Sequence, residues 1–202
     1  MKKRKTLQAL STPSIIHGII ESACGGQRAR NLWRIDRLYD KEYLLILSHE
    51  KPNLDDATDQ IGVGTAITKN YNTLLERVHS DTCWHFRLCA NPTYSLKSTD
   101  GSRGKVKAHI TKEHQRAWLI KQGEKHGFHV TEGSFDVVES RWYYFKGNKP
   151  RQVSILSVTY EGVLKVTDEN VFREALVSGI GRQKAYGLGL LTIMHTEKRL
   201  DE

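Results

Sequence analysis

The stretch TPSIIHGIIESACGG, residues 12–26, followed by LWRIDRLYDKEYLLIL, residues 32–47, decides the fold class of this chain. Thr12 and Pro13 form a typical helix start, and a pair of glycines ends the helix after about three turns. One helical face carries Ile15, Ile16, Ile19, Ile20 and Ala23, and the other carries Ser14, His17, Gly18 and Glu21. His17 is therefore expected to project away from the apolar stripe.

The residues that follow this helix predict an antiparallel hairpin and one more helix and strand. Residues 32–38 alternate moderately in polarity, and residues 43–47 form an apolar run after a short turn. A weaker helical pattern covers about residues 70–78, and residues 82–90 have the composition of a strand. The first part of the chain thus has the order helix, strand, strand, helix, strand.

The second half repeats this alternation after residues 95–105, SLKSTDGSRGK, which predict a mobile basic loop or linker. The expected elements are helix 111–126 ended by Gly127, strands 128–132, 137–145 and 153–166, a helix from the cap Asp168 to residue 177 closed by Gly179, and strand 188–194.

Two such units fit an α+β fold of tandem ferredoxin-like βαββαβ domains, with helices on one face of each antiparallel sheet. We expect an N-terminal domain over residues 1–94, a basic linker over 95–110 and a C-terminal domain over 111–202. The segment MKKRKTLQALS before the first helix has no convincing strand pattern. We therefore expect the first strand of the N-terminal unit to be absent from this chain.

The composition is that of a folded protein with an affinity for polyanions. Of the 202 residues, 38% are hydrophobic and 27% are charged. The 31 Lys and Arg against 23 Asp and Glu give a net charge of +8, which favours nucleic acid as partner. No apolar run approaches the roughly 20 residues of a membrane span, and no signal-peptide pattern is evident. We expect a cytoplasmic protein without a membrane partner that is monomeric when isolated.

The cysteines and the remaining histidines predict neither a disulfide framework nor a metal centre. Cys24, Cys83 and Cys89 are odd in number and include no CxxC pair, so we expect buried reduced thiols. No histidine lies in a metal-binding spacing such as HExxH, and no metal or cofactor is expected. The four tryptophans lie in apolar segments and are expected in the core: Trp33, Trp84, Trp118 and Trp142.

Several segments together resemble one known family. They are TPSIIHGIIESA (12–23) with LWRID (32–36), WHFRLCANP (84–92), KEHQRAWL (112–119), and YEGVLKVTD (160–168) with GIGRQKAYGLGLLTI (179–193). In this order they resemble the CasE-type CRISPR-associated endoribonucleases of type I-E Cascade systems. The resemblance covers nearly the whole chain, and the RLCANP strand, the AWL helix and the glycine-rich loop are its most specific parts.

The resemblance implies metal-independent cleavage of CRISPR precursor RNA at the base of the repeat hairpin, by attack of a ribose 2′-hydroxyl on the adjacent phosphate. It also implies that the protein stays bound to the 3′ hairpin as a Cascade subunit, next to the backbone subunit. His17 matches the catalytic histidine of the family. A histidine, whose unperturbed pKa is near 6.5, can accept or donate a proton at neutral pH.

One position departs from the family pattern, because Ser14 stands where the family often has a tyrosine, one helical turn before the histidine. We assign Ser14 as an orienting or phosphate-contacting group. A basic residue that the sequence does not identify is expected to stabilise the charged transition state.

Two groups of residues are predicted to contact RNA. Glycines at the last helix-to-strand junction let the backbone approach a phosphate closely, with two cations beside them: Gly179, Gly181, Arg182, Lys184, Gly187 and Gly189. Basic side chains in the linker and after the histidine helix supply further phosphate contacts: Arg28, Arg30, Lys97, Arg103, Lys105 and Lys107. An ordinary helix end with a tight turn, and a solvated loop, are the alternative interpretations.

Two other functions stay open at this point. The first is a non-catalytic subunit that binds an RNA hairpin on the same fold, which Ser14 and the missing first strand favour. The second is a generic basic RNA-associated protein, whose affinity would depend steeply on salt and not on hairpin sequence.

Overall fold

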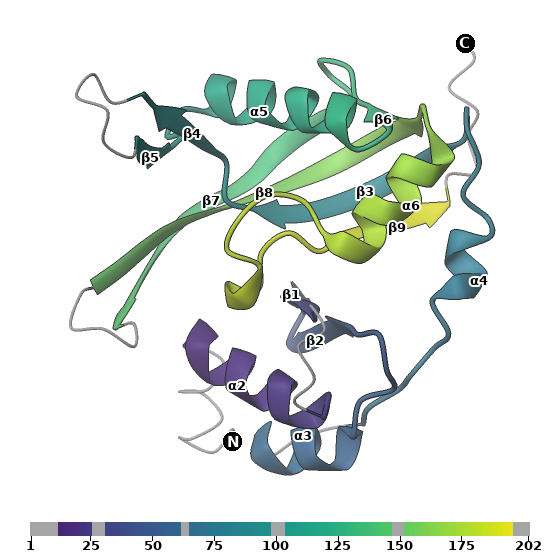
Figure 1. The fold of residues 1–202 in the computed structure, drawn as a ribbon, viewed down its shortest axis with the longest axis vertical. Helices are drawn as coiled ribbons and strands as arrows, with labels where there is room; N and C mark the ends of the chain where they lie inside the picture. Colours follow the sequence, from purple (N-terminus) through teal and green to yellow (C-terminus); the bar gives the residue numbers. More distant parts are fainter. Residues whose placement is uncertain (1–11, 26–30, 62–64, 98–103, 147–151, 196–202) are drawn as a thin grey trace.

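The computed structural model describes residues 12–25, 31–61, 65–97, 104–146 and 152–195 (Figure 1). The elements in chain order are α2 (Pro13–Ala23), β1 (Leu32–Leu38), β2 (Lys41–Leu47), α3 (Leu54–Ile61), α4 (Asn72–Leu75), β3 (Cys83–Ala90), β4 (Thr93–Leu96), β5 (Lys105–Ala108), α5 (Lys112–Lys125), β6 (Phe128–His129), β7 (Phe135–Lys146), β8 (Gln152–Val166), α6 (Glu169–Ser178), the 3₁₀ helix η1 (Lys184–Tyr186) and β9 (Leu191–His195).

The N-terminal elements are a hairpin and two helices that pack against each other. Helix α2 begins at Pro13 as predicted, although the Thr12 side chain makes no capping hydrogen bond. Strands β1 and β2 pair antiparallel from Leu32–Leu47 to Leu38–Lys41, which confirms the predicted hairpin. Ile16 and Ile20 of α2 pack on Trp33 of β1. Ile15, on the same apolar face of α2, is 40% exposed.

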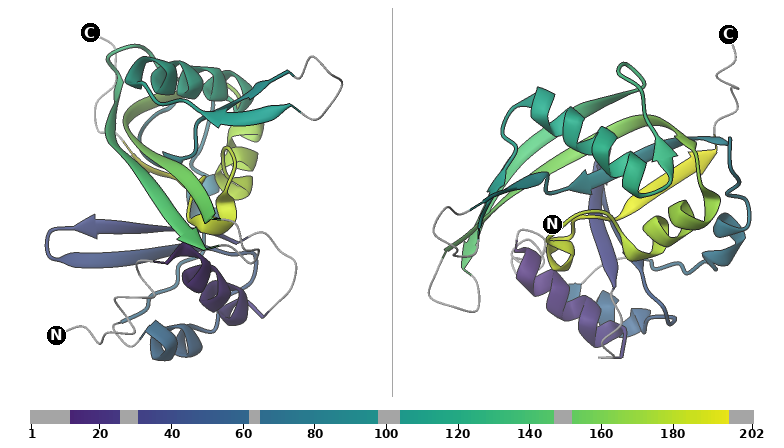
Figure 2. Two further views of the ribbon diagram at one scale, coloured as in Figure 1. Left: turned by 90° about the vertical axis from the view of Figure 1, so that its left-hand side faces the viewer. Right: turned by 45° about the horizontal axis from the view of Figure 1, so that its top comes forward.

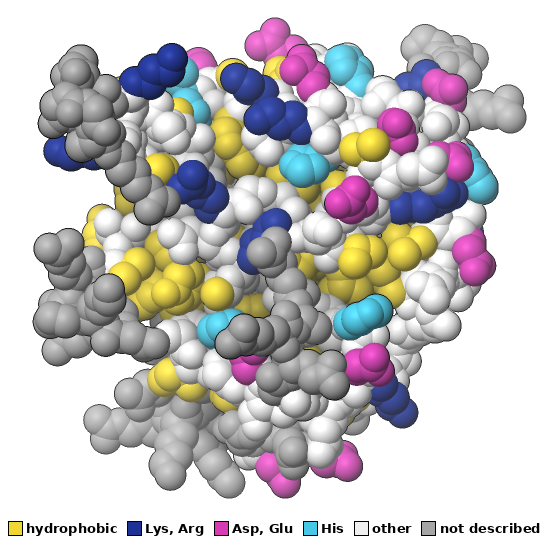
Figure 3. Space-filling view, viewed as in Figure 1, with side chains coloured by type: hydrophobic (Ala, Val, Ile, Leu, Met, Phe, Trp, Pro, Cys, Tyr) yellow, Lys and Arg dark blue, Asp and Glu magenta, His cyan; other side chains and the backbone are white. Residues whose placement is uncertain are grey.

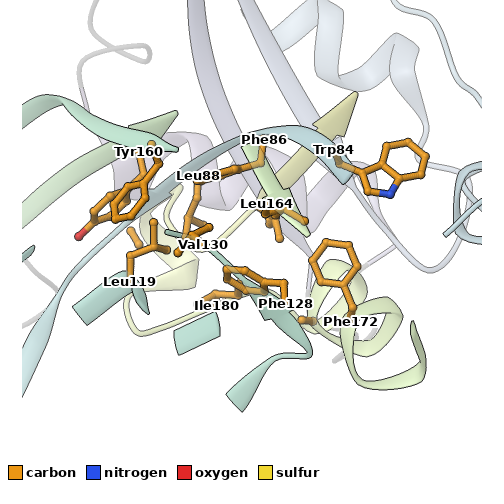
Figure 4. Packing of buried hydrophobic residues seen from close by; sticks show 14 of the residues in the cluster. Trp84, Phe86, Leu88, Leu119, Phe128, Val130, Tyr160, Leu164, Phe172 and Ile180 are labelled. Atoms are coloured by element: carbon orange, nitrogen blue, oxygen red, sulfur yellow. The ribbon is translucent and has the colours of Figure 1, made fainter. Parts of the chain in front are cut away.

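The large sheet has the strand order β6-β8-β3-β9, and β7 continues along the same edge of β8 as β6. Helices α5 and α6 cover one face of it and close the main core (Figures 1 and 2). Figure 4 shows side chains of the sheet and the helices pointing toward one another there: Trp84, Phe86, Leu88, Leu119, Phe128 and Phe172. Burial of this apolar surface is the main favourable term in folding.

Strand β3 lies in the centre of the large sheet, antiparallel to both β8 and β9. The sequence pattern places this strand in the N-terminal unit, and the pairing differs from that assignment. The order β3, α5, β6 with β7, β8, α6, β9 is itself a complete βαββαβ unit. We therefore propose that the boundary between the two units lies before Cys83 instead of after residue 94.

The two ends of the predicted basic linker over residues 95–110 are strands, because β4 and β5 pair antiparallel from Thr93–Ala108 to Leu96–Lys105; residues 98–103 lie outside the described residues. Most side chains of this two-stranded ribbon are exposed, so it lacks the alternation of polar and apolar residues that marks a strand. Elsewhere, only Asn72–Leu75 of the expected helix over 70–78 is helical, and α3 is a helix that the sequence pattern did not predict.

Three of the four tryptophans are buried as expected, whereas Trp142 is 39% exposed on β7 and its predicted place in the core is wrong. The three cysteines are free thiols and all are partly buried. Burial raises the pKa of the Cys89 thiol, which lies 3.0 Å from the Ser157 hydroxyl. The prediction of an absent first strand concerns residues 1–11, which lie outside the described residues.

A buried arginine joins the N-terminal hairpin to the large sheet. Arg34 of β1 is 4% exposed and donates two hydrogen bonds of 2.8 Å to the carboxylate of Asp36. Its remaining donors reach across to β3 and to the start of β9: the carbonyls of Arg87 (3.0 Å) and Leu190 (2.9 Å) and the hydroxyl of Thr192 (2.8 Å). Asp36 also lies 3.3 Å from Nε of Arg87. This network fixes the hairpin on the sheet.

We predict that Arg34→Ala destabilises the protein by about 3–5 kcal/mol, since it leaves the carboxylate of Asp36 buried without its main partner. Urea unfolding measures this loss. Arg37→Ala on the same strand is the matched control, because Arg37 pairs with Glu42 at the surface and such a pair contributes about 0.2–1 kcal/mol. Equal losses for the two variants would contradict the assigned role of Arg34.

Candidate functional site

His17 lies on the outward face of α2, as its helical position predicts. Its side chain is 39% exposed, while Ile16 and Ile20 on the opposite face are buried against Trp33. The apolar contacts thus hold the helix, and the imidazole is left open to a ligand. Ser14, one turn earlier on the same helix, is half-buried.

One acidic side chain accompanies the histidine. Glu21, one turn later on α2, places Oε1 at 3.9 Å from Nδ1 of His17. The same oxygen accepts a hydrogen bond of 3.4 Å from the side-chain amide of Asn31, which is buried. Asn31 therefore holds the carboxylate beside one ring nitrogen of His17. At this distance the carboxylate is a charged neighbour of the imidazole, but the two groups are not hydrogen-bonded.

The glycine-rich loop lies against this helix. Its short helix η1 contacts both α2 and β1, although it is separated from them by most of the chain. Figure 1 shows η1 between the large sheet and α2. The ring of Tyr186 in η1 also lies 4.9 Å from that of Phe145 at the end of β7. The fold thus brings together the histidine helix, the glycine-rich loop and the end of the long β7–β8 hairpin.

Two glycines of this loop are required by packing against the N-terminal hairpin. Gly187 has φ +81°, and a Cβ atom there would lie 2.6 Å from the Trp33 ring. Gly179 has φ +72°, and its Cβ would lie 2.8 Å from Leu32. Both are buried, as is Gly189, while Gly181 is half-buried beside Trp118. Packing is a sufficient reason for these glycines, and their contact with RNA stays a prediction.

The two cations of the loop differ in their surroundings. Lys184 lies over Gly189. The pKa of His126, at the end of α5, is lowered mainly by burial and in addition by the positive charge of Lys184. Lys184 is thus close enough to the end of α5 for its charge to act there. Arg182 is exposed, just before η1.

The other predicted RNA contacts form a second, separate group. Lys97, Lys105 and Lys107 are exposed on or beside the β4–β5 hairpin. Figures 1 and 2 show this hairpin apart from α2. In Figure 3, Lys and Arg side chains gather over the region of β4, β5 and α5. Arg28, Arg30 and Arg103 lie outside the described residues, so their predicted contacts are not placed.

Two features near the site were not found from the sequence. In the sequence, Arg34 occupies an ordinary polar position of the strand over residues 32–38. Tyr186 is one residue of the glycine-rich motif, with nothing that marks it out. A cation between apolar neighbours, as in LWRID, is the signal that points to a buried partner for Arg34. Among the described residues, no group of three or more His, Cys, Asp or Glu side chains is arranged to hold a metal ion.

The fold and the site together define a class of protein. It has two α+β units, and a glycine-rich loop of the second unit packs against the helix of the first unit that bears the histidine. A family model described as "CRISPR associated protein" matches residues 1–195. The chain belongs to this family of CRISPR-associated proteins.

A curated relative and two solved structures narrow the comparison. The endoribonuclease Cse3 of Thermus thermophilus is 32% identical over 117 residues, which are 54% of this chain and 54% of that protein. The alignment thus spans about half the length of this relative. A structure of Thermus thermophilus Cse3 bound to an RNA representing a pre-cleavage complex is 25% identical, with a TM-score of 0.78 and coverage of 95% and 93% of the two chains.

A chain of a CRISPR RNA-guided surveillance complex, in its pre-nicking state, is 20% identical, with a TM-score of 0.70 and coverage of 96% and 95% of the two chains. These likenesses confirm the predicted α+β fold of tandem ferredoxin-like units. No helix in the described part of this chain is long and apolar enough to cross a membrane.

We predict that Gly187→Ala destabilises the protein more than Gly133→Ala does. Both glycines have positive φ, +81° and +93°, but a Cβ at Gly133 meets nothing within 4 Å, whereas one at Gly187 meets Trp33. Backbone strain of about 1–3 kcal/mol applies to both, and overpacking of about 1–3 kcal/mol is added at Gly187. Thermal unfolding of the two variants measures the difference, and equal midpoints would contradict it.

Proposed function

We propose that this protein is a metal-independent endoribonuclease that cleaves CRISPR precursor RNA at the base of the repeat hairpin. The observation that carries the proposal is the position of His17, half-exposed on α2 and beside the glycine-rich loop in a chain of the CRISPR-associated family. The relative named an endoribonuclease, and the neighbour bound to RNA in a pre-cleavage complex, support it.

In the proposed reaction the nucleophile comes from the substrate. The ribose 2′-hydroxyl next to the scissile phosphate loses its proton and attacks phosphorus, and the 5′-oxygen of the next nucleotide leaves and takes up a proton. The products are a 2′,3′-cyclic phosphate and a 5′-hydroxyl. His17 transfers one of these protons through Nε2, and Glu21 positions its ring from the Nδ1 side. No metal ion enters this scheme.

The charged transition state needs a cation close to the scissile phosphate. Arg182 is the candidate in the loop beside α2, because it is exposed just before η1. Ser14 contributes its hydroxyl from the turn of α2 that precedes His17, as an orienting or phosphate-contacting group. The cations of the β4–β5 hairpin, Lys97, Lys105 and Lys107, bind phosphates away from the reacting bond.

After cleavage the protein keeps the 3′ hairpin and acts as a Cascade subunit next to the backbone subunit. The fold likeness to a chain of a CRISPR RNA-guided surveillance complex supports this part of the proposal. A basic protein of this kind recognises the shape of an A-form stem and the bases that flank it, because side chains do not reach into the deep, narrow major groove of RNA.

The second candidate function is a subunit that binds the hairpin without cutting it. The observation that favours it is Ser14, since a serine hydroxyl reaches less far than the tyrosine that the family often has at this position. The two candidates share the fold and the partner and differ only in the chemical step.

We predict that the purified chain cuts its repeat hairpin RNA once, at the base of the stem, in the presence of EDTA. His17→Ala is expected to lose about 10²–10⁴-fold in the single-turnover rate and to keep its affinity for the RNA, because only proton transfer is removed. A denaturing gel and a filter-binding assay measure the two quantities.

The matched control is His129→Ala, which removes an exposed histidine on β6 and is expected to leave the rate unchanged. A 2′-deoxy substitution at the nucleotide before the scissile phosphate is expected to abolish cleavage by the unmodified chain. If the unmodified chain and His17→Ala both bind the RNA and leave it intact, the nuclease proposal is wrong and the second candidate, a subunit that binds the hairpin without cutting it, is supported.

A further inference from the structure

Three aromatic rings from three segments form a ladder of neighbouring, tilted rings at the base of the β4–β5 hairpin. The ring of Tyr94 on β4 lies 4.8 Å from that of His109, with an angle of 33° between the planes. The ring of His109, just after β5, lies 5.7 Å from that of His114 on α5, with an angle of 25°. The ladder lies apart from the histidine helix α2 and has no part in the proposed reaction.

The ladder is held in place before any ligand binds. The backbone N–H of His109 donates to the carbonyl of Pro92 at 2.9 Å, which closes the ribbon beneath the rings. Nδ1 of His114 lies 2.9 Å from the hydroxyl of Thr111, the residue that caps α5. The backbone beneath His109 and the ring of His114 are thus held in place, which reduces the conformational freedom that these groups lose when another ring stacks on them.

The end rings of the ladder are open to solvent. Tyr94 is 40% exposed and His114 is exposed, while His109 between them is half-buried. Burial, with a smaller contribution from the charge of His114, lowers the pKa of His109. The middle ring is therefore neutral at neutral pH.

The charges around the ladder suit a phosphate group. Lys107 lies directly opposite Tyr94 in the register of the ribbon, and Lys105 lies opposite Leu96. Both lysines are exposed, as is Lys112 at the start of α5. Glu113 is the acidic neighbour, and its carboxylate bonds to the backbone and the Thr111 hydroxyl, which hold its pKa below the usual range.

From this juxtaposition we infer that Tyr94, His109 and His114 form a stacking platform for one unpaired RNA base next to the hairpin stem, with Lys107 binding its phosphate. Aromatic side chains stack on single-stranded bases with about 1–3 kcal/mol per base, and a cation nearby holds the backbone. Bases inside the stem have both faces covered by their neighbours, so only an unpaired nucleotide offers a face. This inference rests on RNA being the substrate.

The test compares two RNAs: the repeat hairpin with its unpaired flanks and the bare hairpin. We expect Tyr94→Leu to bind the flanked RNA about tenfold more weakly and the bare hairpin as tightly as the unmodified chain does, because only the flank stacks. Tyr94→Phe keeps the ring and is expected to bind both RNAs normally. Tyr39→Asn, which removes an exposed tyrosine from the β1–β2 turn, is the matched control.

A direct readout uses 2-aminopurine, placed in turn at each unpaired position of the flanked RNA. Stacking on the platform quenches its fluorescence at one position with the unmodified chain and with Tyr94→Phe, but not with Tyr94→Leu. Equal affinity of Tyr94→Leu and the unmodified chain for the flanked RNA, or equal losses on both RNAs, would overturn the platform.

Cleavage of the bare hairpin is followed on a gel in the same samples. If the protein cuts the bare hairpin but Tyr94→Leu has no effect on RNA binding, the proposed nuclease activity stands and the proposed platform is wrong. If Tyr94→Leu weakens binding of the flanked RNA but the protein cuts neither RNA, the proposed platform stands and the proposed nuclease activity is wrong.

Discussion

The structure depends on one buried guanidinium. Arg34 donates hydrogen bonds to Asp36, to two carbonyls and to Thr192, and these partners come from the N-terminal hairpin, from β3, from the residue before β9 and from β9 itself. A buried charge is tolerated only where its partners satisfy it, so the hairpin can dock in one position on the large sheet. The contacts of η1 with α2 and β1 also join the two parts of the chain.

The histidine site follows from this docking. Once β1 is fixed, Trp33 and Leu32 lie where the glycine-rich loop must pass, and glycines at 179 and 187 are the residues that leave room for them. The loop then carries η1 against α2, whose apolar face packs on the same Trp33. One indole thus supports both the helix that bears His17 and the loop that faces it. The site lies between the two units, and neither unit alone contains all of it.

Local features were predictable from the sequence, and pairings between distant segments were not. The face of α2 that carries His17, the β1–β2 hairpin, the Asp168 cap and most strands follow from periodicity and turn residues. The place of β3 in the second sheet does not, because it depends on which distant strands satisfy its hydrogen bonds. The β4–β5 ribbon was not predicted because most of its side chains are exposed, which leaves no alternation of polar and apolar residues.

The surroundings of His17 and those of the β4–β5 hairpin differ in physical character. Around His17 the arrangement is rigid and depends on packing: buried glycines, a buried indole, and a carboxylate held by Asn31. Around the β4–β5 hairpin it depends on exposed charge, which attracts phosphate at long range but orients it weakly. Charge alone would hold an RNA in many registers. The proposed single cut per hairpin therefore requires a contact that fixes the register of the RNA away from the reacting bond, and the proposed stacking platform of Tyr94, His109 and His114, beside those lysines, is such a contact.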